Sequence, residues 1–392
     1  MLALSKNTAT ILFLLLVYLI LIIPFSPLFG VLGYDREIFQ YMGMILANGD
    51  LPYTDAFDHK PPGIYMINLL GFLLSPNSTW GVFIILNLLG FYTVTLVHKM
   101  ATKISENSLM AIFIAILYMA LMNHPYILEG GNLTRQITSY LTVFIAYIVF
   151  VREPSTIASI VLGALVGTIF FFQQNEVLAP GVLIGAYLLF TKNGRLNPIP
   201  IMLRHGGFIL LGIMLRVLLT GFVIFAWGNW DDFIDQAFLF NLGSYVETGS
   251  LFQNIWKFML AGGYLGIVAP MIFLSIGIIL VNVISKRNIS FQFIVICIAI
   301  FFQIIASSLS GRTDGHYFLM FMPLIVFLMI FTSLSMNRKI LYGLSFVLAL
   351  LLVIQLNTSY QFAIKTGNKH TLILSQITEE VQSIKGNKGQ FY

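Results

Sequence analysis

Residues 8–29 read TATILFLLLVYLILIIPFSPLF, an apolar run long enough to cross the hydrocarbon core of a bilayer. Only one charged residue, Lys6, precedes it, and no small-residue cleavage site follows. We therefore interpret the run as a retained membrane helix rather than a cleaved signal peptide. The whole chain has this character, because 58% of its 392 residues are hydrophobic and 9% are charged, whereas soluble domains are about 25% charged. The sequence predicts an all-α, polytopic membrane protein and excludes a soluble enzyme, a disordered regulator and a nucleic-acid-binding protein.

Further apolar runs come near the roughly 20 residues that a spanning helix needs. They are residues 80–97, 108–122, 137–151, 156–172, 177–190, 206–227, 258–284, 291–307, 318–334 and 340–356. With residues 8–29 they predict about 11 transmembrane helices, several of which need flanking residues to reach full length. One more run, residues 63–74, has only 12 residues, a length typical of interfacial or re-entrant segments. We expect it to lie in the membrane surface.

The connections between these runs alternate in charge, which predicts the orientation of the chain. One set holds most of the basic residues: Lys6, Lys99, Lys103, Arg152, Lys192, Arg195, Arg204, Lys286, Arg287, Arg338 and Lys339. The other set collects the acids: Asp35, Glu37, Asp50, Asp55, Asp58, Glu129, Glu176, Asp231, Asp232, Asp235, Glu247 and Asp314. By the positive-inside rule the basic side is cytoplasmic and the acidic side faces outward.

This topology divides the chain into a membrane domain and a short tail. Residues 1–356 form the predicted membrane domain, in which residues 31–79 make one long first outer loop. Residues 357–392 form a polar tail on the outer face. Because the other connections are short, the long first loop is where we expect the function to lie. The single cysteine, Cys297, excludes an internal disulfide and a cysteine-based zinc cluster.

The first outer loop combines acidic and basic residues at one membrane surface. Residues 33–39 read GYDREIF and residues 49–65 read GDLPYTDAFDHKPPGIY. Carboxylates follow the first helix directly, and a turn with a basic side chain, His59-Lys60-Pro61-Pro62, precedes the interfacial run. The proline pair alone is compatible with a simple helix start.

These motifs resemble the first outer loop of the GT-C membrane glycosyltransferases. The similarity is to the branch with the protein O-mannosyltransferases and the lipid A aminoarabinose transferases. That branch has an Asp-x-Glu-like acid motif, a Pro-Tyr-x-Asp segment and a Lys-Pro-Pro turn, matched here at Asp35 and Glu37, at residues 52–55 and at residues 60–62. Residues 311–317, GRTDGHY, are similar to the Arg and His-Tyr pair of the family. One departure is residues 173–176, QQNE, where many relatives carry a lysine.

The resemblance implies a sugar carried on a polyprenyl monophosphate and transferred, with inversion, to an acceptor hydroxyl on the outer face. Asp35 is then the expected general base, and Glu37 shares or orients that role. Lys60 and Arg312 are expected to stabilise the leaving phosphate, and His316 to add a hydrogen bond. The remaining candidates for substrate binding are Asp55, Asp58, His59, Tyr317 and Arg216.

Each assignment has a simpler structural alternative. Asp35 and Glu37 are also suitable helix-capping residues, and Lys60 is also suited to snorkelling at the interface. Arg216 lies within an apolar run, where a charged residue is usually functional unless the helix boundary is misplaced.

We expect no resident metal, because lysine and arginine can hold a monophosphate. The acidic segment Asp231-Asp232-x-x-Asp235 keeps a divalent cation open as an alternative. The expected partners are the lipid-linked sugar donor, membrane lipids and an acceptor lipid, glycan or protein, without nucleic acid. The expected location is the inner membrane, with the active site on its outer, periplasmic face. Two other functions stay open, a lipid-linked polysaccharide polymerase or ligase and a lipid-linked sugar flippase or transporter.

Overall fold

The fold is described from a computed structural model, in which residues 6–31, 33–76, 78–243, 249–260, 290–332 and 338–387 are placed. Within these ranges the chain forms helices and no β-strand. The helices are α1 (Lys6–Ile22), α2 (Tyr34–Asn48), α3 (Gly63–Leu74), α4 (Trp80–Ser105), α5 (Ser108–Met122), α6 (Pro125–Leu128), α7 (Thr134–Val151), α8 (Thr156–Phe170), α9 (Leu178–Leu189), α10 (Ile199–Trp227), α11 (Trp230–Ile234), α12 (Phe240–Gly243), α13 (Leu251–Leu260), α15 (Phe291–Ser308), α16 (Phe321–Thr332) and α17 (Arg338–Asn387).

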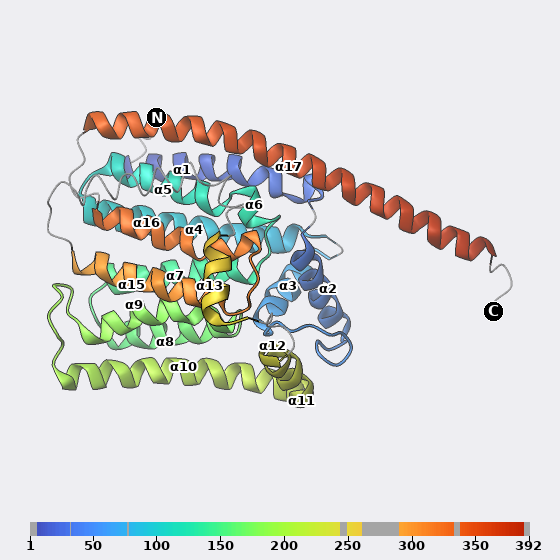
Figure 1. Cartoon of the computed structure of the whole chain (residues 1–392), viewed down its shortest axis with the longest axis horizontal. Coiled ribbons are helices and arrows are strands. Elements are labelled where there is room, and N and C mark those ends of the chain that lie inside the picture. Colours follow the sequence, from blue (N-terminus) through green and yellow to red (C-terminus); the bar gives the residue numbers. More distant parts are fainter. Residues whose placement is uncertain are drawn as a thin grey trace.

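The long helices lie side by side in one bundle, and the short helices α2, α3, α11 and α12 gather at one end of it (Figure 1). Among the described residues, six helices are long and apolar enough to cross a membrane, and shorter apolar helices lie between them. The predicted all-α, polytopic membrane fold is therefore confirmed. The predicted run 258–284 lies almost wholly outside the described residues.

The helices extend beyond several of the predicted apolar runs. The run 80–97 stops before His98, whereas α4 continues for two more turns to Ser105. The polar residues that end the apolar run do not end the helix. Lys103, in the last turn of α4, finds a partner on a neighbouring element, because its ammonium donates to the Val151 carbonyl at 2.8 Å. Helix α10 likewise begins at Ile199, ahead of the run 206–227.

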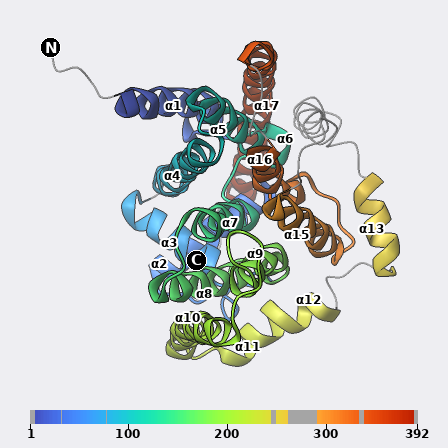
Figure 2. The ribbon, with the colours of Figure 1, turned by 90° about the vertical axis from the view of Figure 1, so that its left-hand side faces the viewer.

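The core of the bundle forms around α5, whose buried residues face neighbours on every side. Seen along the bundle, α4, α7 and α16 surround the centre, and α8 and α10 lie at one edge (Figure 2). Helix α10 presents long apolar side chains outward, including exposed Leu218 and Phe222. An outer surface of this kind is expected where lipid, rather than water, covers the protein.

Charged side chains divide between the two ends of the bundle. At the end where α4 finishes and α8 begins, Lys192 forms an ion pair with Glu153 at 2.5 Å, close to the end of α7. The opposite end carries α2, α3 and the turn before α7, and it holds Asp35, Lys60 and Glu129. We refer to these as the basic end and the site end.

Two helices at the site end follow from local sequence. Helix α2 begins after extended Gly33, carries acids in its first turn and ends at Gly49, which has a left-handed backbone. Helix α3 begins after Pro61 and Pro62 and covers the predicted residues 63–74. It packs against α2 and the start of α4. Its predicted position in the membrane surface stays a prediction.

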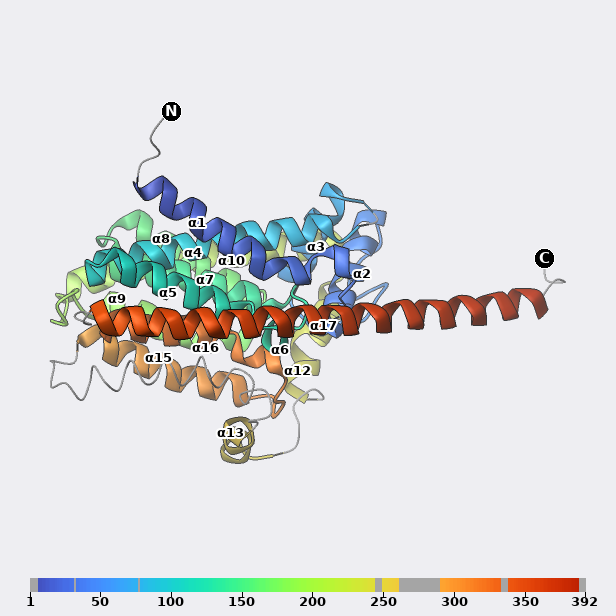
Figure 3. The ribbon, with the colours of Figure 1, turned by 90° about the horizontal axis from the view of Figure 1, so that it is seen from above.

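Helix α17 is the longest element, with 50 residues from Arg338 to Asn387. It contacts α5 and α6 and then projects well past the rest of the bundle (Figure 3). The predicted boundary between residues 356 and 357 therefore falls inside a continuous helix. Residues 357–387 of the predicted tail continue the last apolar run, 340–356, within the same helix.

Candidate active site

The loop between α2 and α3 is folded tightly around its own backbone. The Asp55 carboxylate accepts from the Leu51 backbone N–H at 2.7 Å and closes a turn, and Tyr53 has a left-handed backbone with φ 71°. The hydroxyls of Tyr53 and Tyr65 donate to the Lys60 carbonyl at 2.7 and 2.9 Å. These contacts fix the backbone on both sides of the Lys-Pro-Pro turn.

A second segment, residues 229–241, holds this loop from outside. It contains α11, a π-helical turn at Asp235–Leu239 and the start of α12. Its amide side chains donate to loop carbonyls: Asn229 to Pro52 at 2.6 Å, Gln236 to Tyr53 at 2.5 Å and Asn241 to His59 at 2.7 Å. We call these three contacts the amide clasp. They place loop residues 52–59 against a segment almost 180 positions later in the chain.

A histidine between two carboxylates joins three distant segments at the site end. His316 Nδ1 lies 2.9 Å from Glu129 Oε2, and His316 Nε2 lies 4.0 Å from Asp35 Oδ2. The His316 backbone N–H also donates to Glu129 Oε1 at 3.2 Å. Glu129 has a left-handed backbone, and its carbonyl lies so close to Gly33 that a Cβ there would be 2.5 Å away. The start of α2, with Asp35, is therefore docked against the Glu129 turn.

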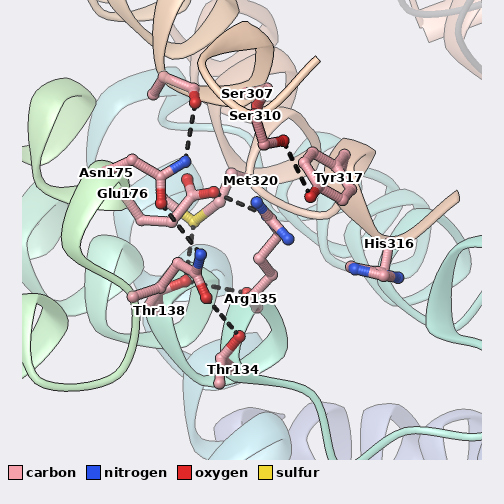
Figure 4. A network of polar contacts seen from close by, with 12 residues as sticks. Thr134, Arg135, Thr138, Asn175, Glu176, Ser307, Ser310, His316, Tyr317 and Met320 are labelled. Carbon is pink, nitrogen blue, oxygen red and sulfur yellow. Dashed lines mark hydrogen bonds and ion pairs between the residues drawn. The ribbon is translucent and has the colours of Figure 1, made fainter. Parts of the chain in front are cut away.

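A buried ion pair lies beside this group (Figure 4). Arg135 Nε donates to Glu176 Oε1 at 2.7 Å, and the Arg135 guanidinium lies 3.5 Å from the centre of the Tyr317 ring. Gln303 donates to the other oxygen of Glu176 at 2.6 Å. Because a buried charge is costly unless it is paired, the carboxylate and the guanidinium stabilise one another here.

A cavity of about 410 Å³ opens between these groups. Its lining is Lys60, Arg135, Phe170, Gln173, Gln174, Asn175, Ala237, Phe238, Asn241, Leu242, Leu309, Ser310 and Tyr317. Tyr317 lines the cavity, and its neighbour His316 lies 4.0 Å from Asp35, which is not itself one of the lining residues. The cavity has the size range of small-molecule sites, with apolar walls and a few polar groups.

The electrostatics of the loop show that its charges lie close together. Burial and, to a smaller degree, the Lys60 ammonium lower the pKa of His59 to about 3, while Asp35 acts in the opposite direction. Arg312 adds a smaller lowering effect on the same pKa. Burial also raises the pKa of Asp58, although Lys60 opposes this shift. Asp35, Lys60 and Arg312 therefore surround a neutral His59 at neutral pH.

The structure brings most of the predicted site residues together. Asp35, Asp58, His59, Lys60, Arg312, His316 and Tyr317 all belong to the site end. Asp55 also lies there, but its carboxylate closes the loop turn. Glu37 is exposed and lines a different groove between α2, α3 and α4, because residues two apart on a helix point to different faces.

Arg216 does not line the cavity and lies in the middle of α10. It packs against α8, with its guanidinium 5.8 Å from the Phe171 ring centre. The acidic segment does not form a metal site: Asp232 accepts from Thr54, and the described residues hold no group of three His, Cys, Asp or Glu side chains arranged to bind a metal ion.

Three residues of the site were not singled out from the sequence as functional. In the sequence, Glu129 and Arg135 are only charges of the outer connections, and Glu176 is a further acid there, within the departing segment QQNE. A usable signal was that Arg135 and Glu176 adjoin long apolar runs. A charge at such a position needs a partner of opposite charge, and Arg135 and Glu176 form an ion pair with one another.

Comparison with known proteins gives a likeness in fold only. No family model and no curated protein sequence matches the chain. The structure of ArnT from Cupriavidus metallidurans bound to undecaprenyl phosphate matches with a TM-score of 0.65 at 14% sequence identity, covering 88% of this chain and 63% of that one. The apo structure of the same protein matches with a TM-score of 0.59 at 14% identity, covering 93% of this chain and 76% of that one.

This chain thus spans about 63% of the length of the first of these relatives. The matched region includes most of the helical bundle described above, and ArnT belongs to the GT-C superfamily. Helix content, apolar spans and this likeness agree with one another. The chain is a multi-pass membrane protein with the GT-C fold.

Proposed function

We propose that the chain is a glycosyltransferase that moves a sugar from a polyprenyl-phosphate carrier to an acceptor hydroxyl. The observation that carries the proposal is the closeness of a carboxylate, Asp35, to a buried lysine, Lys60, at the site end: both act on the pKa of His59, and Lys60 lines the cavity. The likeness to ArnT, whose structure holds undecaprenyl phosphate, supports the same class of donor.

The reaction assigned to this site needs a base and a stabilised leaving group. Asp35 takes the proton of the acceptor hydroxyl, whose oxygen attacks the anomeric carbon of the donor sugar. The bond between that carbon and the phosphate oxygen breaks, and its electron pair stays on the phosphate. Lys60 and Arg312 stabilise the growing negative charge, and attack from the opposite face inverts the anomeric configuration.

From the sequence, His316 is expected to contact the phosphate. Its contacts with Glu129 and Asp35 instead favour a role in positioning Asp35, the proposed base. In the proposed arrangement both ring nitrogens carry a proton, so that Nδ1–H donates to Glu129 and sets the ring orientation, and Nε2–H points toward the Asp35 carboxylate. In the proposed mechanism Glu129 and His316 therefore position the Asp35 carboxylate. Asp58, His59 and Tyr317 complete the surroundings of the donor.

The charge distribution supports an outward-facing site. Basic residues flank the opposite end of the bundle, which the positive-inside rule assigns to the cytoplasm. We place the enzyme in the inner membrane, acting on an envelope lipid, glycan or protein acceptor. No resident metal is part of the proposal, since Lys60 and Arg312 supply positive charge at the leaving group.

The test uses purified protein in lipid with radiolabelled polyprenyl-phosphate sugars and membrane extract as the source of acceptor. We expect one donor to be consumed and its label to move to an extract component, with the same rate before and after metal chelation. Vesicles loaded with labelled donor on one side control for transport. Translocation of the donor without transfer would identify a flippase and refute the proposal, and loss of activity on chelation would assign the phosphate to a metal.

A further inference from the structure

The lining of the cavity carries information about the sugar. Its polar groups are mostly amides and hydroxyls, from Gln173, Gln174, Asn175, Asn241, Ser310 and Tyr317. Such groups donate to and accept from sugar hydroxyls in either direction. Among the described residues that line the cavity, none has a carboxylate side chain.

The lining has two positively charged side chains, Arg135 and Lys60, and each has a partner or a proposed role. Arg135 is paired with Glu176 at 2.7 Å, and its flat face lies on the Tyr317 ring. Glu176 is fully buried and also accepts from Gln303, so its charge is used within the protein. Lys60 is the proposed partner of the donor phosphate. The other described residues of the lining are uncharged.

The amides are also held in place before any ligand binds. Gln173 accepts from Thr134 at 3.0 Å and donates to Asn175 at 3.1 Å, and Asn175 donates to the Ala306 carbonyl at 2.7 Å. Gln174 donates to the Ala237 carbonyl at 2.8 Å. Because these side chains are fixed, they select ligands by hydrogen-bond geometry and do not adapt to a new charge.

We infer that the transferred sugar is uncharged, with hydroxyl groups where related donors could carry an ammonium or a carboxylate. This inference rests on the proposed function, because it assigns Lys60 to the phosphate. An ammonium group would lose its hydration and find no carboxylate among the described lining residues, and an ion pair with Asp35 would occupy the proposed base. Among the described residues of the lining, a second carboxylate would find no cation beyond those already matched to Glu176 and to the phosphate.

The experiment compares donors that differ only in charge. Undecaprenyl phosphate carrying glucose, galactose or mannose is prepared with the matching 2-amino-2-deoxy sugar and the matching uronic acid. We expect one neutral donor to have a kcat/KM at least about 100-fold above its two charged counterparts, since a charge that loses hydration without gaining a partner disfavours binding. A charged donor used within about threefold of the neutral one would overturn the inference and leave the glycosyltransferase proposal standing. If no donor were consumed, the proposed function itself would fail, together with the inference.

A matched pair of variants tests whether the uncharged lining causes the preference. Ser310 Oγ contacts the Tyr317 hydroxyl at 3.1 Å and accepts from the Arg312 backbone N–H at 3.4 Å, and a short acid or amide keeps an oxygen there. Ser310→Asp adds a negative charge to the cavity, whereas Ser310→Asn adds similar volume without charge. We expect the ratio of amino-sugar to neutral-sugar kcat/KM to rise at least about tenfold in Ser310→Asp relative to Ser310→Asn. Equal ratios in the two variants would refute the proposed basis of selectivity.

Discussion

Arg135 and Arg216 both lie on apolar helices, but their surroundings differ. Arg135, at the site end, is paired with Glu176 at 2.7 Å and stacked on Tyr317. Arg216 lies in the middle of α10, with its guanidinium 5.8 Å from the centre of the Phe171 ring. Its buried Nε has no hydrogen-bond partner among the described residues. A charge with partners from distant segments indicates a built site, whereas a charge held by packing alone does not.

The same contrast extends to the two regions as a whole. The site end collects residues from α2, the Lys60 turn, the Glu129 turn and the segment around His316. Helix α10 packs mainly against α8 and exposes apolar side chains. Substitutions at the site end should therefore change catalysis, and substitutions in α10 should change it little.

The largest effect is expected for Asp35→Asn. The amide keeps the shape of the side chain but cannot accept the acceptor's proton, so turnover should fall at least about 100-fold. Donor binding and thermal stability should be nearly unchanged. Asp50→Asn, the same exchange at an exposed acid before the loop turn, is the matched control and should retain activity. Turnover of Asp35→Asn within about threefold of the wild type would show that Asp35 is not the base.

Lys60→Ala and Arg312→Ala test whether both cations act on one phosphate. Each should lower turnover strongly, about tenfold or more, because each stabilises the leaving group. The double variant should lose less than the product of the single effects, since residues that share one function are not additive. Small losses that simply multiply would support the alternative that these side chains are membrane anchors.

A smaller effect is expected for Glu129→Gln, which removes the charged partner of His316. Losing a charge-assisted hydrogen bond should lower kcat about tenfold, while the KM for the donor stays the same, because Glu129 acts through His316 and Asp35. Asp314→Asn, a neighbouring exposed acid, serves as the control. A change confined to KM would place Glu129 in substrate binding instead of in positioning.

The smallest effect is expected for Arg216→Met. Methionine fills a similar volume and removes an unsatisfied buried nitrogen, so the melting temperature should stay the same or rise. Turnover should stay within about threefold of the wild type. A loss above tenfold would restore the substrate-binding role expected from the sequence and would remove the contrast between the two arginines.

The membrane fold could be predicted because its cause is local. The apolar run 108–122 forms α5 with the same bounds, and the run 63–74 forms α3 with the same bounds. The ends of α4 and α10 could not be placed, since polar side chains continue a helix when they find partners on neighbouring elements.

The site could be predicted only in part. Asp35 and Lys60 lie within one motif-rich loop, so the sequence pointed to them directly. The Glu129 contact could not be found this way, because it joins residues 187 positions apart through a left-handed turn. The opposite orientations of Asp35 and Glu37 depend on α2 beginning at Tyr34, a boundary that the acid motif does not determine.

The amide clasp has a consequence for how this protein can vary. Asn229, Gln236 and Asn241 donate hydrogen bonds to backbone carbonyl oxygens of the loop, and every amino acid has such a carbonyl. Mutations in the loop side chains at Pro52, Tyr53 or His59 therefore leave these three bonds available, whereas mutation of an amide removes one. These loop side chains can therefore change without loss of the three bonds, as long as the amides persist.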